Sequence, residues 1–138
     1  MSNEGKVTGI GGVFVKSKDT DALVKWYREI LGFPFDGYGS SFLMREHENP
    51  EEEGYNVWGP FKADTEYFEP SKKDFMINLR VQNLDALMER LLAAGIKEVK
   101  PRESHDYGKF AWIVDPDGTK LELWEQVGPV PETNPEGV

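Results

Sequence analysis

The sequence contains one short pattern twice, and this repeat limits the possible folds more than any other feature. Val13 and Asp21 in the first half have counterparts at the same offset in the second, Ile77 and Asp85 (77 − 13 = 85 − 21 = 64). Each copy is typical of a strand followed by a helix that ends near a glycine. Two related copies favour a pocket between them, so the repeat also indicates where a site would lie.

Composition excludes several classes of protein. A chain of 138 residues, 38% hydrophobic and 30% charged, is typical of one soluble globular domain. The net charge of −9 argues against nucleic acid or a membrane as partner, and no apolar run approaches a membrane span. The absence of cysteine excludes disulfides and thiolate metal sites. No apolar signal region precedes the first strand, so we expect a cytoplasmic location.

The first copy begins with residues 7–17, which alternate like a half-buried strand. Asp19 or Thr20 can cap the following helix, and Gly32 suits its C-terminal end. Further strands are expected at 40–46 and 54–61. The helix carries an apolar stripe at helical spacing: Leu23, Trp26, Tyr27, Ile30 and Leu31.

The second copy repeats this order after a link over residues 62–73. We expect a strand at 75–82, a helix capped by Asn83 and ended by Gly95, and strands at 96–100, 109–114 and 119–126. The sequence therefore predicts an α+β fold of two βαβββ modules, with helices on the outer face of a curved sheet that forms a cleft. One domain spans 1–127, with modules at about 7–61 and 75–127, and 128–138 is predicted to be a mobile tail.

Strand alternation assigns side chains to the two faces of this sheet. The face toward the helices is predicted to hold Val13, Val15, Ile77, Leu79, Ala111, Ile113, Leu121 and Leu123. The free face is predicted to hold Gly12, Phe14, Asn56, Trp58, Met76, Asn78, Arg80, Phe110, Trp112, Glu122 and Trp124. Aromatic rings mixed with a few polar groups are typical of a small-ligand pocket. The alternative is that both faces are core, although Arg80 and Glu122 are costly to bury alone.

The module order and two motifs resemble the vicinal oxygen chelate superfamily, which includes glyoxalase I, extradiol dioxygenases, fosfomycin-resistance enzymes and bleomycin-binding proteins. The motifs are the segment from Asp19 to Gly32 and the Asp-Pro-Asp-Gly-x-x-Leu-Glu-Leu run at 115–123. The resemblance covers about residues 7–127. It implies the fold and a homodimer, but it leaves the activity open because one fold hosts many functions.

The resemblance also places the family's four metal-ligand positions at Gly12, Asn56, Met76 and Glu122. Only Glu122 is a competent ligand for a hard divalent ion. We therefore expect no cofactor, unless a metal site is rebuilt around Glu122. The two histidines, His47 and His105, fall in predicted loops, and His105 is expected at the mouth of the second module.

Glu122 admits three interpretations: a remnant paired to Arg80, a group that binds a ligand, or an acid–base group. The first functional hypothesis is a metal-independent protein that binds a small molecule in an aromatic cleft. Its candidate ligand-binding residues are Phe14, Asn56, Trp58, Met76, Asn78, Arg80, Trp112 and Trp124. The alternative is an enzyme of the lyase, isomerase or dioxygenase type, such as a lactoylglutathione lyase, with Glu122 and His105 as catalytic residues. A third possibility is a dimeric domain that serves a protein contact.

Overall fold

The computed structural model describes residues 4–34 and 39–131. Its elements, in chain order, are β1 (Lys6–Ser17), α1 (Thr20–Leu31), β2 (Ser40–Arg45), β3 (Glu53–Lys62), β4 (Phe75–Gln82), α2 (Leu84–Ala93), β5 (Lys100–His105), β6 (Gly108–Val114) and β7 (Lys120–Gln126). Most of the predicted tail, 132–138, lies outside the described residues. Neither helix in the described ranges is long and apolar enough to cross a membrane.

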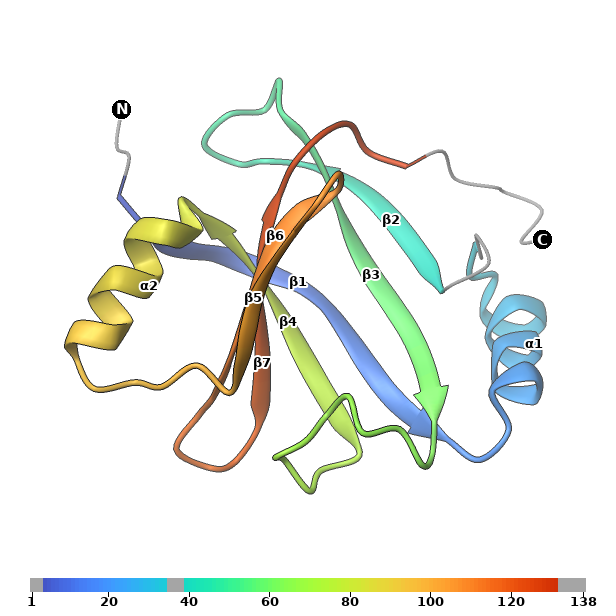
Figure 1. Cartoon of the computed structure of the whole chain (residues 1–138). Helices are drawn as coiled ribbons and strands as arrows, with labels where there is room; N and C mark the ends of the chain where they lie inside the picture. Colours follow the sequence, from blue (N-terminus) through green and yellow to red (C-terminus); the bar gives the residue numbers. More distant parts are fainter. Residues whose placement is uncertain (1–3, 35–38, 132–138) are drawn as a thin grey trace.

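The strands form one curved, open sheet in the order β2-β3-β1-β4-β7-β6-β5 (Figure 1). β1 pairs in parallel with β3 and antiparallel with β4, and β4 pairs in parallel with β7. The antiparallel β1–β4 pair joins the two modules at the centre of the sheet. This arrangement confirms the predicted α+β fold. Among the described residues, the first module contributes three strands and the second contributes four.

Both helices begin at the predicted caps. The Asp19 carboxylate accepts from Ala22 N at 3.0 Å, and the Asn83 side chain accepts from Ala86 N at 3.2 Å. These bonds satisfy amides that have no partner in the first turn of a helix. Gly32 follows α1 with a φ of 73°, the left-handed conformation that glycine adopts readily.

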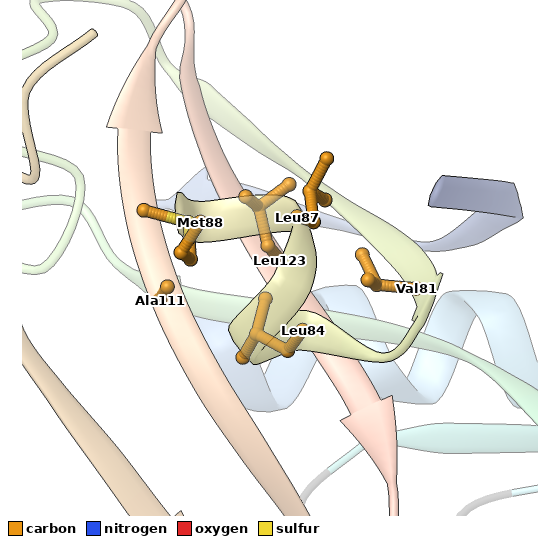
Figure 2. Close-up of a cluster of buried hydrophobic side chains, with 6 residues drawn as sticks. All are labelled: Val81, Leu84, Leu87, Met88, Ala111 and Leu123. Atoms are coloured by element: carbon orange, nitrogen blue, oxygen red, sulfur yellow. The ribbon is translucent and has the colours of Figure 1, made fainter. Parts of the chain in front are cut away.

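Helix α2 covers one face of the second module, as Figure 2 shows. Leu84, Leu87 and Met88 from the helix pack on Ala111 and Leu123 from the strands. Met88 and Ala111 are fully buried. Of the predicted helix-facing residues of β4, β6 and β7, Ala111 and Leu123 are buried in this core and Leu79 and Ile113 pack partly against it. The residues between them lie on the opposite face.

Helix α1 differs from the expectation, because none of its residues is buried. Its main contact is Tyr27, whose ring centre lies 4.1 Å from that of Trp58 on β3. Three members of the predicted stripe stay exposed: Trp26 at 50%, Ile30 at 64% and Leu31 at 54%. The helix lies at one end of the sheet, far from α2 (Figure 1). These exposures show that the sheet covers only part of the apolar stripe of α1.

Candidate functional site

The face of the sheet opposite α2 carries a cleft of about 750 Å³. This volume is in the usual range for small-ligand pockets, roughly 300–1,000 Å³. Its lining is dominated by aromatic side chains: Phe14, Tyr55, Trp58, Phe61, Tyr67, Tyr107, Phe110 and Trp124. Polar side chains complete it: Ser40, Ser41, Asn78, Glu103, His105 and Glu122. The predicted aromatic-lined cleft is therefore present.

Glu122 lies in this cleft with both carboxylate oxygens bonded. The Asn78 amide donates to Oε1 at 2.7 Å, the Trp112 indole donates to Oε2 at 3.0 Å, and the Tyr67 hydroxyl also donates to Oε2. Strand register explains this cluster, because Asn78 and Trp112 are the partners of Glu122 on the two neighbouring strands. The carboxylate is only 6% exposed, and its three partners are neutral donors.

The segment between β3 and β4 supplies a wall of the site that the sequence analysis missed. Phe68 is 1% exposed and packs with Met76 and Trp112 on the cleft face of the second module. Tyr67 stacks on Phe61, with ring centres 5.4 Å apart. The segment has no helical or strand periodicity, so the two adjacent aromatic residues, Tyr67 and Phe68, were the only sequence signal that it contributes to the site.

Tyr67 is held in its neutral form. Burial raises its pKa from the ordinary value of 10.0, and the charge of Glu122 and its hydrogen bond to the hydroxyl add to the effect. Two lysines lie against the same ring: the Nζ atoms of Lys100 and Lys120 are 4.8 and 4.9 Å from its centre. Lys120 also donates to the Tyr67 carbonyl at 2.5 Å. Tyr67 therefore serves Glu122 as a fixed hydroxyl donor.

This environment predicts a dependence of stability on alkaline pH. Because the folded pKa of Tyr67 is raised, the neutral hydroxyl stabilises the fold fully below pH 10.0, and the contribution is lost as pH rises above that value toward the folded pKa. The advantage of the wild type over Tyr67→Phe should therefore be constant up to about pH 10 and shrink between about pH 10 and about pH 12, measured by urea unfolding. A constant difference over this range would contradict the assigned environment.

His105 lies at the end of β5 and lines the cleft, although a loop was predicted there. The strand expected at 96–100 instead runs from Lys100 to His105, so that prediction was wrong. The His105 Nε2 atom is 2.8 Å from Oε1 of Glu103, and its ring stacks on Tyr107 with centres 5.2 Å apart. The hydrogen bond to His105, followed by that to Lys100, lowers the pKa of Glu103. The other histidine, His47, lies outside this cleft, after β2.

Arg80 is not paired to Glu122, so that interpretation was wrong. Its guanidinium donates to Glu46 Oε1 at 2.7 Å and to the Tyr55 carbonyl at 3.1 Å, and it lies 5.1 Å from the centre of the Trp124 ring. It supports Trp124 and is absent from the described lining of the cleft. The sequence placed Arg80 on the correct face but could not identify a partner 34 residues away.

The predicted alternation of β3 was wrong by one residue. Val57 pairs with Gly12, and cross-strand partners share a face, so Tyr55 and Val57 point to the cleft. Asn56 points away, and its amide donates to the Ile10 carbonyl at 2.6 Å. The Trp58 ring packs on Tyr27 beside α1, although part of the residue lines the cleft.

Two of the four metal-ligand positions implied by the resemblance, Gly12 and Met76, lie on the first strand of each module (β1 and β4) and do not fit a divalent ion. A Cβ atom on Gly12 would lie 2.2 Å from the Val57 carbonyl oxygen, so no side chain can be placed there without moving the backbone. Met76, the equivalent position in the second module, is fully buried against Phe68 and Trp112.

The other two positions, Asn56 and Glu122 on the last strand of each module (β3 and β7), fit no better. Asn56 faces away from the cleft, and the Glu122 oxygens are occupied by neutral donors. Over residues 4–34 and 39–131, no group of three or more histidine, aspartate or glutamate side chains is arranged to hold a metal. The four positions therefore do not form a donor set for a divalent ion.

Comparison with known proteins identifies the fold. A family model described as a glyoxalase-like domain matches residues 12–124. No curated protein matches the chain by sequence. Among solved structures, a Streptomyces coelicolor methylmalonyl-CoA epimerase in complex with 2-nitronate-propionyl-CoA has a TM-score of 0.65 and 16% identity, covering 89% of this chain and 100% of that one.

Two further solved structures are similar to the chain, with TM-scores slightly lower than this one. The methylmalonyl-CoA epimerase of Mycobacterium tuberculosis has a TM-score of 0.56 and 20% identity, covering 89% of this chain and 90% of that one. The Mn(II)-bound glyoxalase of Novosphingobium aromaticivorans has a TM-score of 0.59 and 22% identity, covering 93% of this chain and 44% of that one. At these identities the structural likeness establishes the fold alone.

Proposed function

Because this chain belongs to the glyoxalase-like family of the vicinal oxygen chelate superfamily, we propose that it binds a small organic molecule in its aromatic cleft without a metal. The observation that carries the proposal is the state of Glu122. This residue is the single competent carboxylate at the family's ligand positions, and three donors from the protein already bond its oxygens. The cleft wall above it consists of rings suited to stacking on a flat ligand.

The ligand contacts would come mainly from the rings of the second module. Phe110 stacks on Trp112 and on Trp124, with ring centres 6.2 and 6.3 Å apart. Tyr55 meets Trp124 edge-on at 4.9 Å. These contacts hold the rings in place before a ligand enters, which reduces the entropy cost of binding.

Binding can be followed through the indole signals of the protein. Fused-ring aromatic probes such as 1-naphthalenemethanol should shift the signals of Trp112 and Trp124 in a ¹⁵N NMR titration, while Trp26 on α1 serves as an internal reference. Phe110→Ala should weaken the affinity by about tenfold, the size expected for the loss of one aromatic contact. Leu92→Ala, an exposed position on α2, is the matched control. Trp112 and Trp124 signals that no probe shifts would contradict the proposal.

The second candidate is proton transfer by an enzyme that uses His105 and Glu122. The observation in its favour is the His105–Glu103 hydrogen bond at the cleft, an arrangement that orients a histidine as a general base. The three donors on Glu122 weigh against an acid–base role for that carboxylate. We also propose a homodimer, supported by the exposed apolar side chains of α1.

A further inference from the structure

The two carboxylates that line the cleft are each balanced by a lysine. The Lys100 Nζ atom is 3.0 Å from Oε2 of Glu103, which also meets His105. Lys120 precedes Glu122 by two residues on β7, so both side chains lie on the same face of that strand, and their opposite charges attract each other. Neither lysine belongs to the described lining of the cleft. A ligand would therefore meet carboxylates whose charge the protein already offsets.

Two aromatic rings of the lining also carry cations of the protein. The Nζ atoms of Lys100 and Lys120 lie 4.8 and 4.9 Å from the centre of the Tyr67 ring. The Arg80 guanidinium lies 5.1 Å from the centre of the Trp124 ring. A cation beside a ring weakens the attraction of that ring for a second cation, because the two positive charges repel each other. These rings therefore remain surfaces for a flat apolar group more than for a charged one.

A charged ligand of either sign would lose its hydration without gaining a free counter-charge. An anion would meet Glu103 and Glu122, the two carboxylates of the described lining. A cation would find Glu103 already paired, and Glu122 only 6% exposed with its oxygens bonded by three neutral donors. Burying a charge without a partner is costly, whereas an uncharged aromatic molecule needs only the rings.

We propose that the cleft selects an uncharged, flat aromatic ligand, and that Lys100 sets this selection. Lys100 is the cation that balances Glu103. Its ammonium also lies 4.4 Å from the centre of the Trp112 ring, beside the donors of Glu122. The Lys100 side chain is 34% exposed, so it can be replaced without opening the core. The inference rests on the proposed function and adds the charge class of the ligand and the residue that determines it.

Three probes that share a ring system and differ in charge test this selection. They are 1-naphthalenemethanol, 1-naphthylmethylammonium and 1-naphthoate, each titrated by calorimetry into the full chain near neutral pH and at one ionic strength. The uncharged alcohol should bind about tenfold more tightly than either charged probe, because each charged probe must be desolvated without a partner.

Variants of Lys100 then identify the residue responsible. Lys100→Met keeps the apolar stem but leaves Glu103 without its lysine, so the ammonium-to-alcohol affinity ratio should rise about threefold. Lys97→Met changes the net charge equally at an exposed position before β5 and should leave the ratio unchanged. In Lys100→Met/Glu103→Gln neither charge remains, and the ratio should return to that of the wild type. A purely structural loss would weaken all three probes alike and would not move the ratio.

The possible outcomes separate this inference from the proposed function. Binding of the ammonium or the naphthoate that equals or exceeds that of the alcohol would overturn the selection of an uncharged ligand while leaving the binding function in place. A ratio that is unchanged in Lys100→Met, or still raised in the double variant, would overturn the role of Lys100. Failure of all three probes to bind would contradict the binding function itself, and the charge class with it.

Discussion

Glu122→Ala is expected to lower the free energy of unfolding by about 3–5 kcal/mol, the cost typical of breaking a buried, hydrogen-bonded charge site. The substitution removes the acceptor of three donors at once: the Asn78 amide, the Trp112 indole and the Tyr67 hydroxyl. Asn78 and Trp112 are 2% and 1% exposed, so water cannot readily replace the lost partner. The measurement is urea unfolding followed by circular dichroism.

Glu122→Gln separates shape from charge at the same position. A glutamine keeps one carbonyl acceptor, and the Tyr67 hydroxyl can rotate to accept from the new amide, so the expected cost is about 1–2 kcal/mol. Glu89→Ala on the exposed surface of α2 is the control, with an expected change within about 0.5 kcal/mol. If Glu122→Ala unfolds within about 1 kcal/mol of the wild type, the three hydrogen bonds are not formed in solution.

Much of the fold could be predicted because its signals are local. The caps at Asp19 and Asn83 and the left-handed Gly32 depend on residues within one helical turn, and all three are confirmed. The face pattern of β4 and β7 was also correct, because the residues on the cleft side of these strands, Met76, Asn78, Arg80, Glu122 and Trp124, are all buried and their neighbours face the other way. The repeat itself supplied the order of the modules.

The errors came from tertiary contacts. In β3 both faces carry aromatic residues, so alternation alone could not distinguish Tyr55 from Trp58. Asn56-Val57-Trp58 is similar in sequence to Glu122-Leu123-Trp124, and this likeness would place Asn56 on the same face as Glu122. In the structure, Tyr27 on α1 instead supplies the surface on which Trp58 packs. The β5 strand is short, polar and contains a proline, so its sequence carries no strand pattern.

Only part of the site could be predicted, because tertiary contacts complete it. Strand parity brought Asn78, Trp112 and Glu122 to one face, and the hydrogen bonds between them agree with it. Tyr67 lies 55 residues before Glu122, in a segment without regular structure, and its contribution depends on how that segment folds back over the sheet. No local pattern encodes such a contact.

Placing histidines at Gly12 and Met76, two of the family's four metal-ligand positions, is not expected to create a metal site. The double variant Gly12→His/Met76→His should bind no stoichiometric nickel, zinc, manganese or iron(II), and its free energy of unfolding should fall by about 3 kcal/mol or more. A side chain at position 12 begins 2.2 Å from the Val57 carbonyl oxygen, so β1 and β3 must separate to admit it. At position 76 an imidazole would replace a fully buried methionine between Phe68 and Trp112.

Elemental analysis of protein purified without a histidine tag, combined with urea unfolding, measures both effects. Gly9→His is the matched control, since Gly9 is also on β1 and a Cβ atom there meets no atom within 4 Å. This variant should keep the stability of the wild type to within about 1 kcal/mol. One metal per chain in a stable double variant would contradict this prediction. It would mean that the four positions can still form a metal site, and that the close contacts at Gly12 and Met76 do not prevent metal binding.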